Sequence, residues 1–209
     1  AVSPELREKM GHAAVTAAKA AGYVNAGTIE FLLEPDGKFW FMEMNTRIQV
    51  EHPVTEWVTG IDLVKEQLKI ASGMPLEIAQ EDVRIQGHAI ECRINAENPQ
   101  KNFRPSPGTI QGAHFPGGNG IRVDTCVYNG CKIPPYYDSM LAKLIVHAGN
   151  RKEAIAKMQS ALGEVIIDGI DTNIDYQYEI LKDEDYQSGN FDTGFLASHI
   201  IAGVKINEN

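Results

Sequence analysis

Two strand-like segments flank a single turn near the start of the chain, and together they restrict this region to an antiparallel hairpin. Residues 28–33 and 39–44 are rich in aromatic and branched side chains, which favour strands. Pro35, Asp36 and Gly37 between them are residues that tight turns require. The segments are therefore predicted to pair side by side.

Two glutamates interrupt the apolar pattern of these segments. With a four-residue loop, Leu33 would face Trp40, and the same register would place Glu30 opposite Glu43 on one face. Two carboxylates held side by side repel each other and require a cation or a shared proton. Asn45 points the same way, and this set of hard oxygen ligands suits Mg²⁺ or Mn²⁺. Two alternatives remain: both glutamates face water, or a three-residue loop shifts the register and separates them.

Helices are predicted on both sides of the hairpin. The Ser-Pro-Glu sequence at 3–5 is a strong helix start, and the Ala-rich helix that follows ends at Gly22. Residues 45–54 lack a clear period and are predicted to form a loop. Asp62 then caps a second helix that Gly73 ends. The predicted apolar stripe of this helix comprises Leu63, Val64, Gln67, Leu68 and Ala71.

An acidic, irregular stretch at 74–86 predicts a boundary, beyond which strands dominate. Segment 88–95 alternates as a strand, with Ala89, Glu91 and Arg93 on one face. Further strands are predicted at 109–115, 121–128 and 140–147, and helices at 151–165, 173–181 and 193–200. The fold class is therefore α+β, with antiparallel sheets covered by helices. The expected domains are 1–84 and 85–200, followed by a tail at 201–209.

Residues 45–53 (NTRIQVEHP) contain a second group of polar side chains. Arg47, Gln49 and Glu51 alternate, so in an extended segment they share one face. An arginine can clamp a small planar anion, a glutamine adds a donor, and a glutamate can accept a proton. Beside a metal, this set suits chemistry on a carboxylate, carbonate or phosphate. A polar loop with a local Arg–Glu ion pair is the alternative. Arg93, flanked by apolar residues in its strand, is of a kind that usually pairs across the sheet.

The composition argues against several classes of protein. A net charge of −9 disfavours a nucleic-acid partner. Cys92, Cys126 and Cys131 contain no close CxxC pair, which predicts reduced thiols rather than disulfides or a zinc site. No apolar run approaches the roughly 18–20 residues that span a membrane, so we expect no membrane segment and a cytoplasmic location. The first residue is Ala1 rather than Met, which suggests a chain that begins inside a longer protein.

Five segments resemble the biotin carboxylase family. The most specific is 43–56 (EMNTRIQVEHPVTE), which is similar to the family signature. The others are 87–97 (GHAIECRINAE), 105–108 (PSPG), 134–143 (PPYYDSMLAK) and 166–173 (IIDGIDTN). The resemblance weakens only towards the C-terminus. It implies the second half of an ATP-grasp fold followed by the biotin carboxylase C-terminal subdomain, with the first half, including the glycine-rich lid, missing.

The resemblance also implies a metal and nucleotide site on the hairpin. Glu30, Glu43 and Asn45 correspond to metal ligands, and Glu30, Leu32 and Glu43 correspond to ATP contacts. The expected cofactor is ATP with Mg²⁺ or Mn²⁺, in which the metal neutralises the phosphates as charge builds during transfer.

A bicarbonate and biotin site is implied by the neighbouring motifs. Arg47, Gln49, the Val50 backbone and Arg93 correspond to the residues that bind bicarbonate and biotin. Glu51 corresponds to the base that takes the bicarbonate proton, and Arg93 to the residue that stabilises enolate-like charge on the biotin ureido oxygen. Glu51, Arg93 and Arg47 are therefore the expected catalytic residues.

The implied activity is ATP-dependent carboxylation of carrier-bound biotin, the first half-reaction of acetyl-CoA carboxylase in fatty acid biosynthesis. Bicarbonate is phosphorylated to carboxyphosphate, which breaks down to CO₂ and phosphate, and deprotonated biotin attacks the CO₂. The expected partners are a biotin carboxyl carrier protein, carboxyltransferase subunits and a second copy in a homodimer. Because an ATP-grasp site lies between two halves, we expect this chain alone to be inactive.

Three alternatives stay open. The chain could be the biotin carboxylase region of a pyruvate or propionyl-CoA type carboxylase. The residues at 45–47 (NTR) and 50–53 (VEHP) resemble acyl-CoA carboxylases more than pyruvate carboxylase. Carbamoyl phosphate synthetase shares a Glu-x-Asn-x-Arg element but lacks the continuation at 49–52 and the strand of Arg93. A non-catalytic interaction domain is the third alternative.

Overall fold

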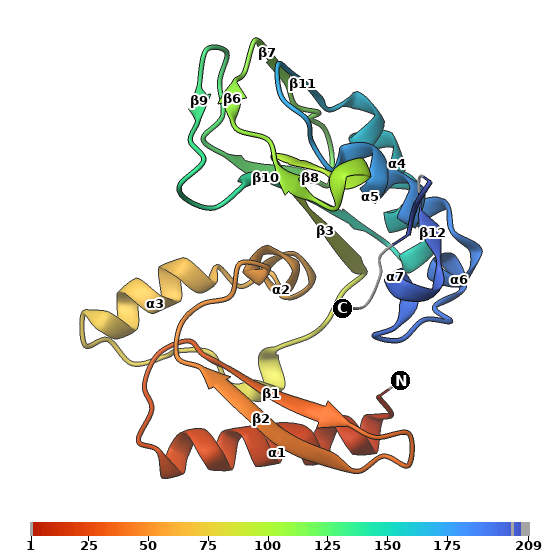
Figure 1. The fold of residues 1–209 in the computed structure, drawn as a ribbon. Coiled ribbons are helices and arrows are strands. Elements are labelled where there is room, and N and C mark those ends of the chain that lie inside the picture. The colour runs from red at the N-terminus through yellow and green to blue at the C-terminus, as the bar shows by residue number, and fades with distance from the viewer. Residues whose placement is uncertain (1, 202, 206–209) are drawn as a thin grey trace. The chain divides into compact units, whose positions relative to one another are not determined.

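A computed structural model describes residues 2–201 and 203–205, and the chain separates into two compact units (Figure 1). Unit 1 comprises Ala1–Glu56 and Gly60–Val83, and unit 2 comprises Trp57–Thr59 and Arg84–Asn209. The predicted tail at 201–209 lies mostly outside the described residues. The fold is α+β, as predicted, with antiparallel pairing throughout the described strands.

Helix α1 (Pro4–Ala20) opens unit 1 and begins as its sequence predicts. The Ser3 hydroxyl accepts a hydrogen bond from the Leu6 amide at 3.2 Å, and Pro4 occupies the first turn. The helix ends before Gly22, whose φ of 62° is left-handed.

Strands β1 (Thr28–Leu33) and β2 (Phe39–Asn45) form the predicted hairpin with a loop shorter than expected. The Glu34 amide donates to the Lys38 carbonyl at 2.8 Å, which leaves three loop residues ending at Gly37 with φ 85°. The expected pairing of Leu33 with Trp40 is therefore wrong, because Leu33 pairs with Phe39 and Leu32 with Trp40.

A β-bulge further along the hairpin restores the register at the glutamates. The register shifts between Glu30 and Phe31, where Met42 is the extra residue of β2. Beyond the bulge, Glu30 pairs with Glu43, as predicted. The shorter loop and the bulge thus shift the register in opposite directions and offset each other.

Helices α2 (His52–Thr59) and α3 (Leu63–Ala71) follow the hairpin. The predicted loop is wrong from His52 onwards, because Pro53 in the first turn favours a helix that is too short to show a clear period. Asp62 caps α3 as predicted, accepting from the Lys65 amide at 2.9 Å. The predicted stripe is correct at Leu63 and Gln67, which line an apolar cavity in unit 1 together with Glu66 and Ile70. It is wrong at its other members, because Val64, Leu68 and Ala71 are exposed.

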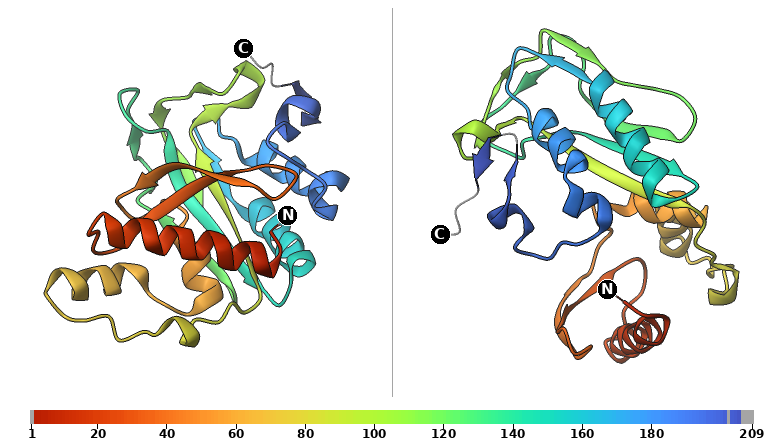
Figure 2. Two further views of the ribbon diagram at one scale, coloured as in Figure 1. Left: turned by 90° about the horizontal axis from the view of Figure 1, so that it is seen from below. Right: turned by 90° about the vertical axis from the view of Figure 1, so that its right-hand side faces the viewer.

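Unit 2 is built on a three-stranded antiparallel sheet with the order β3–β10–β8. These strands are His88–Asn95, Met140–Ala148 and Ile121–Thr125, close to the predicted ranges. Helices α4 (Arg151–Glu164) and α5 (Ile174–Lys182) pack against the sheet and each other (Figure 2). The main core includes Ile94, Ile110, Leu144, Val146, Met158 and Leu162.

Short strand pairs and turns complete unit 2. The predicted strand at 109–115 divides into β6 (Gly108–Thr109) and β7 (Gly112–His114), and β8 ends three residues before its predicted limit of 128. The pairs are β4 (Glu97–Asn98) with β5 (Arg104–Pro105), β6 with β9 (Lys132–Ile133), β7 with β11 (Ile166–Asp168), and β12 (Ile200–Ile201) with β13 (Val204–Lys205). The short helices are η1 (Gln80–Asp82), η2 (Pro99–Lys101), α6 (Glu184–Ser188) and α7 (Phe195–Ser198). Among the described residues, none of the helices combines the length and apolarity needed to cross a bilayer.

Candidate functional site

The two hairpin glutamates converge on one amide side chain. Asn45 Nδ2 donates to Glu30 Oε1 at 2.9 Å and to Glu43 Oε1 at 3.0 Å. Each carboxylate thus accepts from a neutral donor that both share. The arrangement stabilises two negative charges that would otherwise repel.

A network extends from these carboxylates into the segment that follows β2. Arg47 donates through one terminal nitrogen to Asn45 Oδ1 at 2.9 Å, and through the other to Gln49 Oε1 at 2.8 Å. Gln49 Nε2 reaches back towards Glu30 Oε1 at 3.4 Å. These amide oxygens hold the guanidinium in place. Because they are neutral, its positive charge remains to attract an anion.

The donor set of this network fits a hard divalent cation. Glu30 and Glu43 supply carboxylate oxygens, and Asn45 can supply its amide oxygen. As described, Asn45 turns its nitrogen to the carboxylates and its oxygen to Arg47. A cation between the acids would favour the opposite amide orientation, because only the oxygen can ligate it.

Val50 and Glu51 lie in a turn rather than in an extended segment. The His52 amide donates to the Gln49 carbonyl at 3.2 Å, and Glu51 has φ −81° and ψ 12° at the start of α2. The expectation that Glu51 shares an extended face with Arg47 and Gln49 is therefore wrong. The chain turns there because helix α2 begins at the next residue. Glu51 is nevertheless exposed at the start of that helix.

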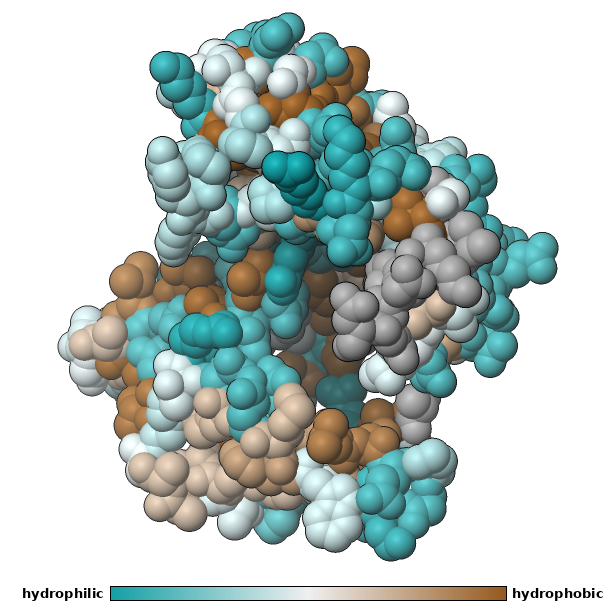
Figure 3. Space-filling view, in the orientation of Figure 1, coloured by the Kyte–Doolittle hydropathy of each residue, from teal (hydrophilic) through white to brown (hydrophobic). Residues whose placement is uncertain are grey.

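Leu32 lies two residues along β1 from Glu30, on the same face of the strand. It is 58% exposed, although it is apolar. Four other apolar residues of the hairpin are also exposed, namely Leu33, Trp40, Phe41 and Met42. Hydrophobic surface, brown and tan, is visible in the lower half of the view in Figure 3. Exposed apolar residues of this number mark a segment suited to contact with another molecule or another part of a domain.

Arg93 belongs to unit 2, whereas the other predicted site residues belong to unit 1. It lies on β3 opposite Lys143 of β10 and is exposed between buried Cys92 and Ile94. The predicted alternation is confirmed from Ile90 to Ile94, whereas Ala89, predicted on the face of Arg93, is buried. Arg93 thus projects from the face of β3 opposite the main core.

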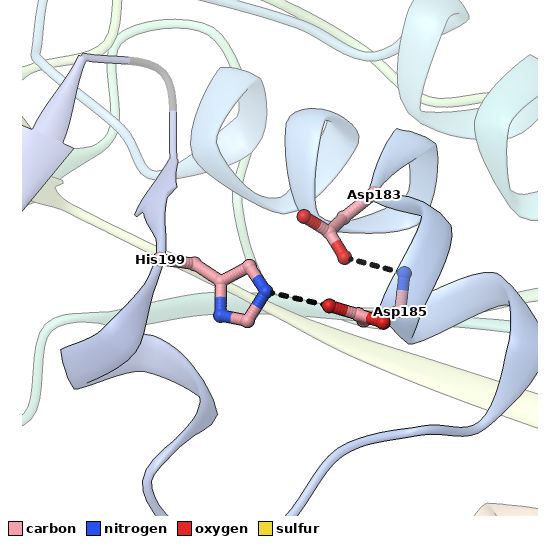
Figure 4. A group of neighbouring side chains, drawn as sticks. All are labelled: Asp183, Asp185 and His199. Atoms are coloured by element: carbon pink, nitrogen blue, oxygen red, sulfur yellow. Dashed lines mark hydrogen bonds and ion pairs between the residues drawn. The ribbon is translucent and has the colours of Figure 1, made fainter.

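A polar cluster in unit 2 did not emerge from the sequence, because its members come from separate short elements (Figure 4). Asp183 caps α6, accepting from the amides of Asp185 and Tyr186. His199 Nε2 lies 3.1 Å from Asp185 Oδ2, and this hydrogen bond raises the pKa of His199. Hydrogen bonds from Asn190 and then His199 lower the pKa of Asp185. Helix capping and this ion pair account for the cluster.

Two family models match the chain. The model described as Biotin carboxylase C-terminal domain matches residues 91–198, which is more than half of the chain. The model described as Carbamoyl-phosphate synthase L chain, ATP binding domain, matches residues 1–79.

Curated relatives and solved structures agree with these matches. Biotin carboxylase 1 of Bacillus subtilis is 57% identical over 204 residues, which cover 97% of this chain and 45% of that protein. One of the pyruvate carboxylase subunits of Methanothermobacter thermautotrophicus is 56% identical over 195 residues, covering 93% and 40%. The biotin carboxylase domain dimer of Hydrogenobacter thermophilus 2-oxoglutarate carboxylase, solved with MgADP, ADP and bicarbonate, has a TM-score of 0.92. It is 51% identical and covers 95% of this chain and 44% of its own.

The chain spans less than half the length of the relatives it matches. The match over 91–198 is to a domain of biotin carboxylases, and the match over 1–79 is to an ATP-binding domain. The alignment with the Bacillus subtilis protein, 57% identical overall, covers 97% of the chain and so includes parts of both regions. On these grounds, the chain belongs to the biotin carboxylase family.

Proposed function

We propose that the protein containing this chain carboxylates biotin with bicarbonate at the expense of ATP. Bicarbonate oxygen attacks the γ-phosphorus, forming carboxyphosphate and releasing ADP. Carboxyphosphate separates into CO₂ and phosphate, and a deprotonated ureido nitrogen of biotin attacks the CO₂ carbon. The network that joins Glu30, Asn45 and Glu43 to Arg47 is the observation that carries this proposal, because it combines cation ligands with an anion clamp.

The hairpin is proposed to form one side of the nucleotide-binding site. Glu30, Glu43 and Asn45 would hold Mg²⁺ or Mn²⁺, which would neutralise phosphate charge when bound. Leu32 would offer an apolar surface to the nucleotide from the same face of β1 as Glu30. The MgADP named with the Hydrogenobacter structure supports this choice of ligand.

The anion site is assigned to the segment after β2 and to β3. Arg47, Gln49 and the Val50 backbone would bind bicarbonate, and Glu51 would accept its proton as a general base. Arg93 would contribute positive charge to bicarbonate and to the ureido oxygen of biotin as negative charge develops there. The bicarbonate named with the same Hydrogenobacter structure supports this ligand class.

The proposed setting is acetyl-CoA carboxylase in a cytoplasmic homodimer, with a biotin carboxyl carrier protein and carboxyltransferase subunits as partners. A 2-oxo acid carboxylase is the second candidate. It is favoured by the high identity to part of a pyruvate carboxylase and to a 2-oxoglutarate carboxylase. Biotin carboxylation is common to both, so the acceptor of the carboxyl group distinguishes them.

The chain alone is proposed not to turn over ATP. Pro53 is the only residue of unit 1 that is buried among those described. The apolar residues at the surface of its two-stranded sheet are suited to contact with another part of the domain, which would complete the ATP site. Isothermal titration of this chain with Mg·ATP is therefore expected to show no micromolar affinity.

The test of function uses the complete protein with ATP, Mg²⁺, bicarbonate and free biotin. Glu51→Gln should lower bicarbonate-dependent ATP hydrolysis by about 100-fold or more, the usual contribution of a general base. Glu8→Gln makes the same chemical change on exposed helix α1 and should leave the rate unchanged. Equal rates for the two variants would contradict the role of Glu51, and absence of biotin carboxylation in the unaltered protein would contradict the function itself.

A further inference from the structure

Strand β3, which carries Arg93, lies at one edge of its sheet. It pairs with β10 on one side, so the amides and carbonyls on its other side need partners from elsewhere. Two side chains of the α5 region supply them. The contacts they make fall on the backbone at and just after Arg93.

Asn173, the residue that precedes α5, pairs with this edge almost as a neighbouring strand would. Its backbone amide donates to the Asn95 carbonyl at 3.2 Å, and its Oδ1 accepts from the Asn95 amide at 2.8 Å. Its Nδ2 donates to the Arg93 carbonyl at 3.1 Å. Asn173 is only 6% exposed, so a full set of hydrogen bonds is needed to offset the burial of its amide.

Gln177 adds a second donor to the same carbonyl. Its Nε2 lies 3.1 Å from the Arg93 oxygen. Gln177 is four residues after Asn173, about one helical turn, so the two side chains reach the same carbonyl. Two amide donors therefore converge on the carbonyl of one residue, and that residue is the arginine assigned to the anion site.

We propose that Asn173 and Gln177 are positioning residues that fix the backbone of Arg93 and thereby the reach of its guanidinium. This inference rests on the proposed role of Arg93. An arginine side chain is long, so a small change in the direction of its Cα–Cβ bond moves the charged end by a larger distance. A misplacement of about 1 Å can cost about 100-fold in rate when a group must meet reacting atoms.

A purely structural role would have different consequences. Loss of an amide donor to a backbone carbonyl would then lower stability alone, wherever that carbonyl lies. Gln159 provides the matched control, because its Nε2 donates at 3.1 Å to the Leu181 carbonyl, which belongs to α5 rather than β3. Gln159→Met and Gln177→Met remove the same donor with the same change of side chain.

The kinetic experiment compares these two variants in the complete protein. Gln177→Met should lower kcat/KM for bicarbonate by about 10-fold or more through loss of alignment, with KM for ATP unchanged. Gln159→Met should leave both values unchanged. Equal values of kcat/KM for bicarbonate in the two variants would overturn the inference.

A second measurement needs no turnover and uses this chain. The Arg93 Nε–Hε resonance should show increased side-chain motion in Gln177→Met and Asn173→Asp, while that of Arg122 should not change. Arg122 is a suitable reference because two of its nitrogens donate to Asp124 at 2.7 and 2.8 Å. Unchanged Arg93 motion in both variants would overturn the inference.

Arg93→Ala separates this inference from the proposed function. If Arg93→Ala retains full activity, the proposed role of Arg93 fails. If Arg93→Ala is inactive while Gln177→Met matches Gln159→Met, the role of Arg93 stands and the positioning inference fails.

Discussion

Asn45 Nδ2 lies 2.9 Å from Glu30 Oε1, on the neighbouring strand, and donates a hydrogen bond to it. The same nitrogen also donates to Glu43 Oε1, so a single neutral group bridges two carboxylates. A divalent cation would bind the same oxygens more strongly, because it carries full charge and accepts several oxygen ligands. The first prediction follows from this competition.

Mn²⁺ should stabilise the hairpin of this chain against urea. At 100 times its Kd, a ligand that binds only the folded state adds about 2.7 kcal/mol. Glu43→Gln should remove most of this stabilisation, whereas Glu34→Gln should retain it, because Glu34 instead accepts from Trp40 Nε1 at 2.7 Å. Fluorescence of Trp40 in a Trp57→Phe background reports the transition. Equal Mn²⁺ effects in both glutamine variants would show that the cation binds elsewhere.

Cys92 should resist thiol reagents in the folded chain. Burial, followed by the nearby charge of Glu91, raises the pKa of this thiol to about 12, so its reactive thiolate is scarce at pH 8. Cys126 is exposed and should react first. Mass spectrometry after brief iodoacetamide treatment, with and without urea, measures each site. Equal labelling of Cys92 and Cys126 without urea would contradict the described burial.

The contact between His199 and Asp185 should weaken as the pH rises. The hydrogen bond to Asp185 raises the pKa of His199, so its contribution to stability is complete below about pH 6.5 and lost as the pH passes the raised value. The pKa of Asp185 is lowered, so its contribution is lost only in acid, below about pH 4.

Hydrogen exchange of the His199 amide, which donates to the Phe195 carbonyl at 3.1 Å, measures this effect. After correction for the intrinsic pH dependence, protection should fall between pH 6 and pH 8.5. The His199→Gln variant should show no such fall. A fall of the same size in that variant would assign the pH dependence to another group.

Replacing a buried and an exposed isoleucine by valine should lower the free energy of unfolding by different amounts. Ile110 is 0% exposed and Ile166 is 51% exposed. Ile110→Val should lower the free energy of unfolding by about 0.5–1.5 kcal/mol, because it leaves a small cavity. Ile166→Val should change it by less than about 0.5 kcal/mol. Urea denaturation of both variants compares them, and a larger loss for Ile166→Val would contradict the described core.

Elements governed by neighbouring residues could be predicted from the sequence. The cap of α1 depends on Ser3 and Pro4, and the strand 88–95 on an alternating pattern over most of its length, so both were predicted correctly. Helix α2 was missed because its eight residues are too few to display a helical period. Local signals thus identified most elements but missed α2 and several two-residue strands, such as β4 and β5.

The candidate site was predictable only in part, because sequence patterns report mainly on residues that are close together in the chain. Glu30, Glu43 and Asn45 come together within one hairpin, where strand pairing fixes their relation. Asn173 accepts a hydrogen bond from the amide of Asn95 in β3, which lies 78 residues away in the sequence. No local sequence pattern predicts such a contact. The roles of Arg47, Gln49, Glu51 and Arg93 depend on ligands and stay predictions.

The bulge at Met42 bears on how this segment can change in length during evolution. Deleting Met42 would join Phe41 directly to Glu43, and the two strands would then keep one register from the loop to Asn45. Glu30 and Glu43 would remain opposite each other. The hairpin can therefore tolerate the loss of one residue at this position, and related chains that differ in length here need not differ in their carboxylate pair.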